Sequence, residues 1–464
     1  MTTNPALGED ERTADADELT PPGRSSPALA LTAGLLGFTL VCLDASVVNV
    51  ALPAIGSSLG GGMSGLQWVV DAYTLAFAAL MLSTGAFSDR AGASRAYALG
   101  TAVFTLASAA CGLAPGLPSL IGARVVQGVA AAVVLPASLA LVRQAYPDPA
   151  RRARAVAAWA AGGSAAVALG PVAGGVLTSA WDWRAVFFVN LPVGAAVLLL
   201  LLRAPRSARR PAPLDLPGQV TAVVALTALT FAVIERGATG AVALAVAVVA
   251  GVVFFRVEAR GPHPVVPLGL FRDRTVAVSV ATGAAVSVAF YSVVFVFSLY
   301  FQQVRGLGPL AAGLAFLPMT GLIAVTNVVA GKLAGRFGPR LPMVVGQWVA
   351  VAGLLLLLLS VGADTPAPLV AVLLVPLALG CALTVPPLTA AMMDAVPAER
   401  AGLAAGVLNA ARQVAGGLGI AVFGTLVADG FATGMRLSLA VAAVLLAVTG
   451  AFSFRLAGRP ATRP

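Results

Sequence analysis

The chain of 464 residues is 59% apolar and only 10% charged, whereas soluble globular domains carry about 25% charged residues, so the composition excludes a water-soluble globular protein. Its formal net charge of +10 does not indicate nucleic-acid binding, because the basic residues lie in short loops between apolar runs and form no basic stripe with interleaved aromatic residues. The apolar runs are about twenty residues long, which is the length that crosses roughly 30 Å of hydrocarbon as a helix, and we therefore expect an all-α polytopic membrane protein.

In chain order, the first segment is a polar and acidic tail over residues 1–27, unlike the basic start of a signal peptide, and we expect it to be disordered. Fourteen apolar segments follow, and a short polar tail over residues 458–464 ends the chain. The expected membrane spans are 28–55, 66–87, 95–114, 118–142, 154–178, 185–202, 217–235, 239–257, 275–301, 309–331, 341–361, 366–391, 402–427 and 436–456.

The basic residues are distributed unevenly between the two sides of these spans. An even number of spans places both ends of the chain on one side of the membrane. With the N-terminal tail inside, 23 Lys and Arg residues fall on the inner side and 4 on the outer side. Short cytoplasmic loops carry such an excess, so we predict a multi-pass protein of the bacterial inner (plasma) membrane with both termini in the cytoplasm.

A short glycine-containing motif occurs twice, at an offset of 246 residues. Repeated halves around a central site are typical of alternating-access transporters. We therefore predict an N-terminal six-helix bundle over 28–202, an inserted helix pair with its flanking loops over 203–260, and a C-terminal six-helix bundle over 261–457. The two copies of the motif comprise Gly85, Asp89, Arg90 and Gly92 after the second span, and Gly331, Arg336 and Gly338 after the tenth.

The first copy of the motif resembles the signature between the second and third helices of the major facilitator superfamily, although Ala93 and Ser94 stand where adjacent basic residues are usual. The resemblance implies that the seven residues of both copies gate the conformational cycle. Other stretches resemble the fourteen-helix drug:proton antiporters of that superfamily, of the EmrB/QacA type. They are Leu43 to Pro53 in the first span, Tyr300 to Gly306, and Asn409 to Gly417, while Arg124 to Gly128 in the fourth span resembles the helix-4 motif of the whole superfamily.

The fifth span contains a stretch that is similar to the antiporter motif of exporters. Its residues are Gly170, Pro171, Gly174 and Gly175. Small residues on one helix face allow close backbone approach, and the proline allows a bend. The resemblance implies that this face meets the other half of the protein and biases it against leak; a tight helix contact without that role is the alternative.

Three ionisable residues of the first bundle, Asp44, Asp71 and Arg124, are expected at about the same depth in the membrane. A charge at the bilayer centre costs about 2.5–3.5 kcal/mol on insertion scales, so each is a functional candidate. Burial disfavours an ionised carboxylate and a nearby Arg favours it, so an interrupted contact with Arg124 can load and release a proton. The alternative is a permanent structural ion pair.

Aromatic and polar residues at membrane depth form the expected substrate site. Phe290, Phe297 and Phe301 share one face of the ninth span, and aromatic walls suit planar apolar or cationic ligands. Lipid-facing aromatic residues are the alternative. Four polar residues of other spans complete the expected site, namely Asn49, Gln127, Asn409 and Arg412.

The expected function is export, in exchange for protons, of small apolar or cationic organic compounds such as drugs, antibiotics or toxic metabolites, by a monomer. A proton-coupled importer of a small nutrient is the alternative, and the fifth-span motif argues against it. An enzyme and a metal site are not expected, because the three cysteines are isolated and His263 is the only histidine. The sequence has no glycine-rich phosphate loop, so we expect no nucleotide or other cofactor and a proton gradient as the energy source.

Overall fold

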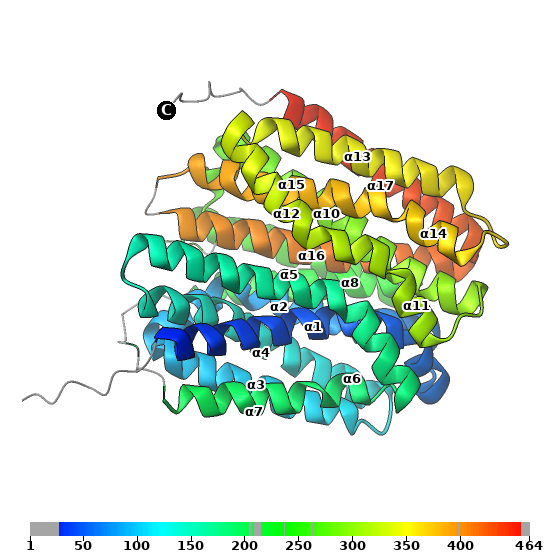
Figure 1. Cartoon of the computed structure of the whole chain (residues 1–464), viewed down its shortest axis with the longest axis horizontal. Helices are drawn as coiled ribbons and strands as arrows, with labels where there is room; N and C mark the ends of the chain where they lie inside the picture. The colour runs from blue at the N-terminus through cyan, green and yellow to red at the C-terminus, as the bar shows by residue number, and fades with distance from the viewer. Residues whose placement is uncertain are drawn as a thin grey trace, which may run out of the picture.

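The computed structural model describes residues 27–455 apart from 204–206, 208–214, 236, 262, 263, 265, 398 and 399. His263 and the two polar tails, apart from Pro27, therefore lie outside the described residues. Every element in the described part of the chain is helical (Figure 1). The helices up to the middle of the chain are α1 (Pro27–Leu59), α2 (Gly62–Ala91), α3 (Ala93–Gly112), α4 (Leu117–Ala145), α5 (Pro149–Ala180), α6 (Ala185–Phe188), α7 (Asn190–Leu201), α8 (Leu216–Ile234) and α9 (Ala238–Arg260).

The second part of the chain starts with a short 3-10 helix, η1, and continues with a long helix whose last turn, η2, is a π-helix. All fourteen expected spans coincide with helical segments. The elements are η1 (Leu268–Arg272), α10 (Arg274–Leu299), η2 (Tyr300–Val304), α11 (Pro309–Ala315), α12 (Leu317–Phe337), α13 (Arg340–Ser360), α14 (Ala367–Leu373), α15 (Val375–Asp394), α16 (Ala401–Asp429) and α17 (Phe431–Phe454).

Eleven helical segments of the described residues are long and apolar enough to cross a membrane. The joined segment Ala185–Leu201 is apolar but shorter than these eleven. Helices α2 and α3 are not counted among them either. The chain is thus an all-helical membrane protein with eleven candidate spans.

Local chemistry explains where several helices begin. Asp148 accepts a hydrogen bond from the Arg151 backbone N–H at 2.8 Å and so caps α5. Asp273 accepts from the backbone N–H groups of Thr275 and Val276 at 2.7 and 3.2 Å and caps α10. Such side chains satisfy amide groups that have no partner within the helix.

The long helices lie side by side, with α1 to α7 in the lower part of Figure 1 and α12, α13, α15 and α17 in the upper part. We call α1 to α7 the first group and α10 to α17 the second group. Helix α2 packs against α16, and α5 packs against α11 and α12, so these helices join the two groups. Helix α8 packs against α9, α2 and α16.

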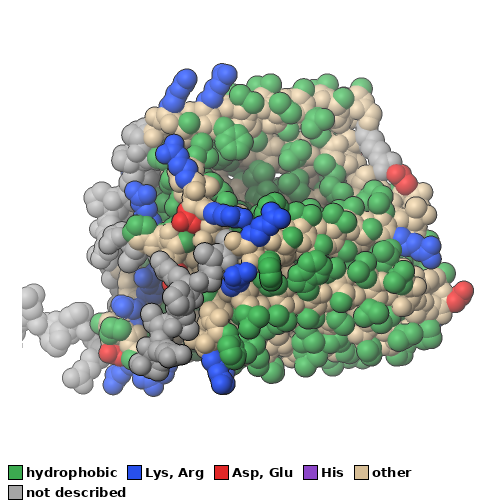
Figure 2. Space-filling view, turned by 90° about the horizontal axis from the view of Figure 1, so that it is seen from above, with side chains coloured by type: hydrophobic (Ala, Val, Ile, Leu, Met, Phe, Trp, Pro, Cys, Tyr) green, Lys and Arg blue, Asp and Glu red, His purple; other side chains and the backbone are tan. Residues whose placement is uncertain are grey.

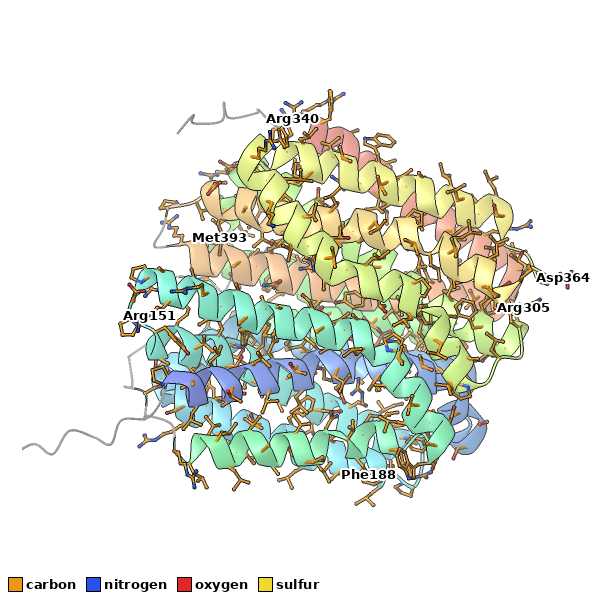
Figure 3. The ribbon with its side chains drawn as sticks, viewed as in Figure 1. Arg151, Phe188, Arg305, Arg340, Asp364 and Met393 are labelled. Atoms are coloured by element: carbon orange, nitrogen blue, oxygen red, sulfur yellow. The ribbon has the colours of Figure 1, made fainter. Side chains whose placement is uncertain are left out.

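Helix α1 begins and α17 ends at the same end of the bundle, which we call the terminal end; the other is the distal end (Figure 1). Figure 3 places Arg151 and Arg340 at the terminal end and Arg305 and Asp364 at the distal end. Lys and Arg side chains gather at the terminal end in the view of Figure 2, whereas apolar side chains cover the flank between the ends. This distribution matches a bundle whose flank faces lipid.

The largest hydrophobic core lies toward the distal end and contains residues of both groups. It includes Val47, Val48, Ala51, Leu52 and Ile55 of α1 together with Phe295, Phe297 and Phe301 of the α10 segment. Two contacts between the groups reinforce it: Ser298 Oγ donates to the Asn49 carbonyl at 2.7 Å, and Gln302 Nε2 donates to the Val50 carbonyl at 2.9 Å. The two groups are therefore packed together at the distal end.

Candidate functional site

A buried carboxylate in the middle of α1 forms the centre of a polar network. Asp44 is 0% exposed. Arg124 Nη1, from α4, donates to Asp44 Oδ2 at 2.5 Å. Gln127 Nε2, one turn further along α4, donates to Asp44 Oδ1 at 2.9 Å, and Asn190 Nδ2, from the first turn of α7, donates to the same oxygen at 2.8 Å. Both oxygens of the carboxylate thus have donors.

The guanidinium of Arg124 is equally well enclosed. Its Nε donates to the Val69 carbonyl of α2 at 3.0 Å, and its Nη1 also donates to Gln127 Oε1 at 2.8 Å. The ring of Tyr73 lies 4.2 Å from its Cζ. Buried charges persist only when they are paired and hydrogen-bonded, and these contacts meet both conditions. The expected ionic contact between Asp44 and Arg124 is present in this structure.

Asp71 is placed differently from the sequence expectation. It is 0% exposed on α2, but neither carboxylate oxygen has a hydrogen-bond partner among the described residues. A Cβ atom built on Gly417 would lie 3.6 Å from Asp71 Oδ1, so this carboxylate faces α16. The structure therefore brings Asp44 and Arg124 together, whereas Asp71 lies at the contact between the two groups. A shared depth does not place two side chains on facing sides of their helices.

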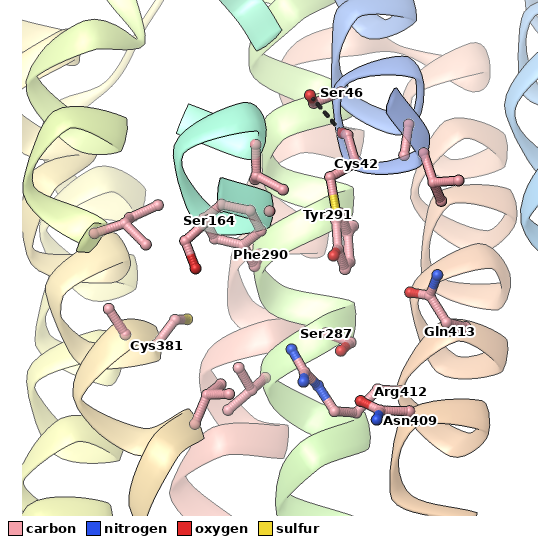
Figure 4. A pocket seen from close by; sticks show the side chains of 18 of the residues that line it. Cys42, Ser46, Ser164, Ser287, Phe290, Tyr291, Cys381, Asn409, Arg412 and Gln413 are labelled. Atoms are coloured by element: carbon pink, nitrogen blue, oxygen red, sulfur yellow. Dashed lines mark hydrogen bonds between the residues drawn. The ribbon is translucent and has the colours of Figure 1, made fainter. Parts of the chain in front are cut away.

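A cavity of about 380 Å³ lies between the two groups, on the terminal side of the distal core. Its first-group wall includes Phe38 and Ala45 of α1 and Trp159 of α5, and Phe38 stacks on Trp159 with 3.9 Å between ring centroids. Its second-group wall includes Phe290 and Tyr291 of α10. Neither α8 nor α9 contributes to the lining described here. Both groups thus share one central cavity (Figure 4).

Polar side chains of α16 line one side of this cavity. Figure 4 shows Asn409, Arg412 and Gln413 together on this helix, with Ser287 of α10 opposite them. Arg412 is the only charged residue in the lining described here. The cavity therefore combines aromatic walls with one cation and a few hydrogen-bonding groups.

The expected substrate residues divide into those that line the cavity and those that do not. Phe290, Asn409 and Arg412 line it. Phe297 and Phe301 do not; both are 0% exposed in the distal core. They share a helical face with Phe290 but lie two and three turns further toward the distal end, where the two groups are packed together.

The two expected polar residues of the first group also lie outside the cavity lining. Asn49 Nδ2 donates to the Ala45 carbonyl within α1 at 3.3 Å. Gln127 belongs to the network around Asp44. Their side chains serve the interior of the first group in this structure.

The glycine-rich face of α5 makes two kinds of close contact. A Cβ atom on Gly170 would clash with the Ser46 side chain of α1. A Cβ atom on Gly174 would lie 2.4 Å from the Val47 carbonyl oxygen of α1. A Cβ on Gly175 would lie 2.6 Å from the Pro309 carbonyl oxygen of α11. On the facing helix, a Cβ atom on Gly313 of α11 would lie 2.4 Å from the Pro171 carbonyl oxygen of α5. Pro171 and Gly175 therefore meet the second group, whereas Gly170 and Gly174 pack against α1 of the first group.

The two copies of the repeated motif have the same backbone geometry. Gly92 follows α2 with φ 87°, and Gly338 follows α12 with φ 79°. Side chains are strained at such positive angles. Gly85 and Gly331 are helical, with open space around them. Of the remaining motif residues, Arg90 is exposed, Arg336 lies 5.2 Å over the Phe337 ring, and the side chain of Asp89 lies outside the described residues.

Sequence reasoning did not assign a role to Asn190, which holds Asp44, or to Trp159, which lines the cavity. A lone amide within the apolar segment 185–202 was the available signal for Asn190. Its contact with α1 spans 146 positions in the sequence and depends on how α7 packs. Trp159 carried no distinguishing signal among the other apolar residues of its span.

The family model of the Major Facilitator Superfamily matches residues 34–420. The chain belongs to this superfamily. It is 41% identical over 414 residues to the multidrug resistance protein Stp of Mycobacterium tuberculosis, covering 86% of this chain and 76% of the relative. It is 36% identical over 442 residues to the methylenomycin A resistance protein of Streptomyces coelicolor, covering 93% of both chains.

A third relative is the tetracenomycin C resistance and export protein of Streptomyces glaucescens, 34% identical over 415 residues, with 88% of this chain and 77% of the relative covered. Among solved structures, a D-xylose-proton symporter superimposes with a TM-score of 0.68 at 15% identity, covering 93% of this chain and 98% of the symporter. At that identity the likeness supports the fold alone. The fold is thus that of superfamily transporters.

Proposed function

We propose that this protein exports small organic compounds, such as antibiotics or other toxic metabolites, from the cell in exchange for protons. One combination of features supports this function. A fully enclosed carboxylate–guanidinium pair, Asp44 and Arg124, lies in the first group beside a cavity that both groups share. The relatives described above have names that refer to drug resistance or export. Helix α5 also contains the stretch Gly170 to Gly175, which resembles the antiporter motif of exporters.

The proposed architecture has fourteen transmembrane segments. We assign α2, α3 and the segment Ala185–Leu201 as spans in addition to the eleven candidates, because each lies alongside the long helices of the bundle (Figure 1). Residues 28–202 and 261–457 then form two six-helix bundles of one antiporter of the EmrB/QacA type. Residues 203–260 contribute the inserted pair α8 and α9, which stand outside the cavity lining. The protein acts as a monomer, without a cofactor, and the proton gradient drives it.

The proposed orientation places the terminal end, which carries most of the basic residues, in the cytoplasm. The distal end is packed shut, and the cavity lies toward the terminal end. We assign this arrangement to a cytoplasm-facing state, in which Asp44 is bound to Arg124. In this state the cavity can receive a compound from the cytoplasm.

The rest of the cycle follows from the chemistry of the pair. When the distal end opens and the contact with Arg124 is broken, Asp44 takes a proton from the outside. A neutral carboxyl group costs little to enclose again. Return of the guanidinium favours the ionised form and releases the proton to the cytoplasm. Asp71 lies where α2 meets α16, so it is a second proton carrier whose surroundings change as the groups move.

The experiment that tests this function uses inside-out membrane vesicles that contain the protein and a pH-sensitive fluorescent dye. After respiration has acidified the vesicles, methylenomycin A, tetracenomycin C and a wider antibiotic panel are added in turn. An exported compound should release protons and restore the fluorescence, and a protonophore should abolish its uptake. Vesicles without the protein are the control. If no compound in the panel moves protons or is accumulated, the export function is wrong.

A further inference from the structure

We propose that the central cavity selects organic anions, with Arg412 receiving the carboxylate of an aromatic acid. This inference rests on the proposed export function and specifies its substrate class. Sequence reasoning expected apolar or cationic compounds. The charges that line the cavity favour the opposite sign.

The charge inventory of the cavity is simple. Arg412 lines it, and no Asp or Glu does so in the part of the chain that the structure describes. The nearby buried acids do not compensate for this cation. Asp44 is held by Arg124 inside the first group, and Asp71 is not part of the lining. A cationic compound that entered this space would face a like charge and no fixed anion.

Arg412 also lacks the partners that a structural arginine has. Within the described residues its guanidinium makes no hydrogen bond or ion pair, and its buried Nε has no acceptor. Arg124, by contrast, has a carboxylate, an amide oxygen and a backbone carbonyl as acceptors. A cation at membrane depth is costly and is normally paired. The unused donors of Arg412 therefore indicate a ligand that brings the missing anion.

The surroundings of Arg412 suit a carboxylate. A guanidinium can donate two parallel hydrogen bonds to the two oxygens of such a group. Asn409 precedes Arg412 by three positions and Gln413 follows it, and both line the same cavity. Figure 4 shows the Arg412 side chain reaching from α16 toward Ser287 on the facing α10. These side chains can donate further hydrogen bonds to an anion held at this point.

The remaining walls suit the apolar body of the same compound. The stacked rings of Phe38 and Trp159 lie on one side, and Phe290 and Tyr291 lie on the other. A volume of about 380 Å³ is at the lower end of the roughly 300–1,000 Å³ typical of small-molecule pockets. An aromatic acid with two or three fused rings has the size and the shape for this space.

Three probes with the same bicyclic body separate the charge classes: 1-naphthoate, which is an anion at neutral pH, methyl 1-naphthoate, which is neutral, and 1-naphthylmethylammonium, which is a cation. Their radiolabelled forms are bound to the purified full-length protein in detergent, with empty micelles as the blank. The wild type should bind the anion more tightly than the ester and much more tightly than the cation.

The Arg412→Gln variant should bind the anion about ten- to a hundredfold more weakly, which corresponds to losing a charge-assisted hydrogen bond, while its affinity for the ester stays within about twofold. Arg412→Lys should keep part of the anion preference. Arg274→Gln is the matched control, because it removes the same charge from an exposed position outside the cavity lining. Unchanged ester binding also reports a folded cavity.

Two results would overturn the assignment: a wild type that prefers the ester or the cation, or an Arg412→Gln variant that keeps the anion preference. Neither result affects the export function, which depends on the vesicle experiment. Conversely, selective anion binding without proton-linked transport in vesicles would leave the cavity assignment in place and remove the export function.

Discussion

Among single residues, the pair formed by Asp44 and Arg124 has the most consequence for stability as well as for transport. Removal of one partner from a buried ion pair leaves an uncompensated charge and typically costs about 3–5 kcal/mol. We therefore expect Asp44→Asn to lower the melting temperature of the purified protein and to abolish proton-driven efflux. Melting in detergent and efflux from cells measure the two effects.

A double variant separates the structural role of the pair from its transport role. Asp44→Asn combined with Arg124→Gln leaves no unpaired charge at this site, so it should recover most of the lost stability. It should remain inactive in proton-driven efflux, because the carboxylate–guanidinium pair that loads and releases the proton is gone. Full activity of the stable double variant would remove this pair from the coupling mechanism.

The site residues show what the sequence could and could not specify at this scale. The scarcity of charge in an apolar span identifies Asp44 and Arg124 as functional candidates, and the structure places the two side chains in contact. The same reasoning grouped Asp71 with them, but the rotation of α2 turns that carboxylate toward α16. Helical periodicity likewise placed Phe297 on the same face of its helix as Phe290. It could not indicate that the two groups of helices pack together at the distal end and bury Phe297 there. Facing directions depend on helix packing, which a single sequence does not specify.

At the scale of helices and turns, the two glycines that follow α2 and α12 provide a direct test of the repeated motif. Gly92 and Gly338 adopt φ angles of 87° and 79°, a conformation that costs other residues about 1–3 kcal/mol. We expect Gly92→Ala and Gly338→Ala to lower both the melting temperature and the efflux rate. The controls are Gly85→Ala and Gly331→Ala, which add a methyl group in open space on a helix and should be tolerated. Equal sensitivity of all four would show that the turn geometry is not the reason for glycine.

The close contact between α5 and α11 can be tested by substituting the glycines that allow it. A methyl group on Gly175 or Gly313 would press on backbone atoms of the facing helix at 2.6 or 2.4 Å. Overpacking costs about 1–3 kcal/mol, so Gly175→Ala and Gly313→Ala should shift the protein toward a state that is open at the distal end. Gly321→Ala on α12, which meets open space, is the control.

A cysteine placed at Ser298 reports this opening. The Ser298 side chain is 0% exposed and bonds to α1 in the packed distal end. In a background with the three native cysteines replaced by alanine, an impermeant maleimide should label Ser298→Cys faster in the two glycine variants than in the control. Equal labelling rates would mean that this helix contact does not hold the distal end closed.

The sequence predicted the helices better than their interruptions. Each expected span coincides with a helical segment, because long apolar runs are strong signals. The expected continuous span 309–331, however, is divided near Phe316 into α11 and α12, and Pro318 occupies the first turn of the second segment. Proline lacks the backbone N–H that would continue the helix. Whether such a proline bends or interrupts a span depends on the helices that pack around it.

For the whole molecule, the number of membrane crossings determines on which side each chain end lies. Eleven helices in the described part of the chain are long and apolar enough to cross a membrane, and an odd number of crossings would place the two chain ends on opposite sides. In the structure α1 begins and α17 ends at the same end of the bundle (Figure 1). The proposed fourteen crossings, in which α2, α3 and Ala185–Leu201 also span the bilayer, agree with that arrangement.

Tags at three positions should distinguish the two cases. A tag before residue 1 and a tag after residue 464 should both be protected from an impermeant label in intact cells, because the proposed fourteen spans place 23 basic residues on the cytoplasmic side and 4 on the other. A tag inserted in the loop between α13 and α14, next to Asp364 at the distal end, should be labelled. Permeabilised cells, in which all three tags should react, are the control for tag accessibility. Labelling of only one chain end in intact cells would contradict the fourteen-span arrangement and require an odd number of crossings.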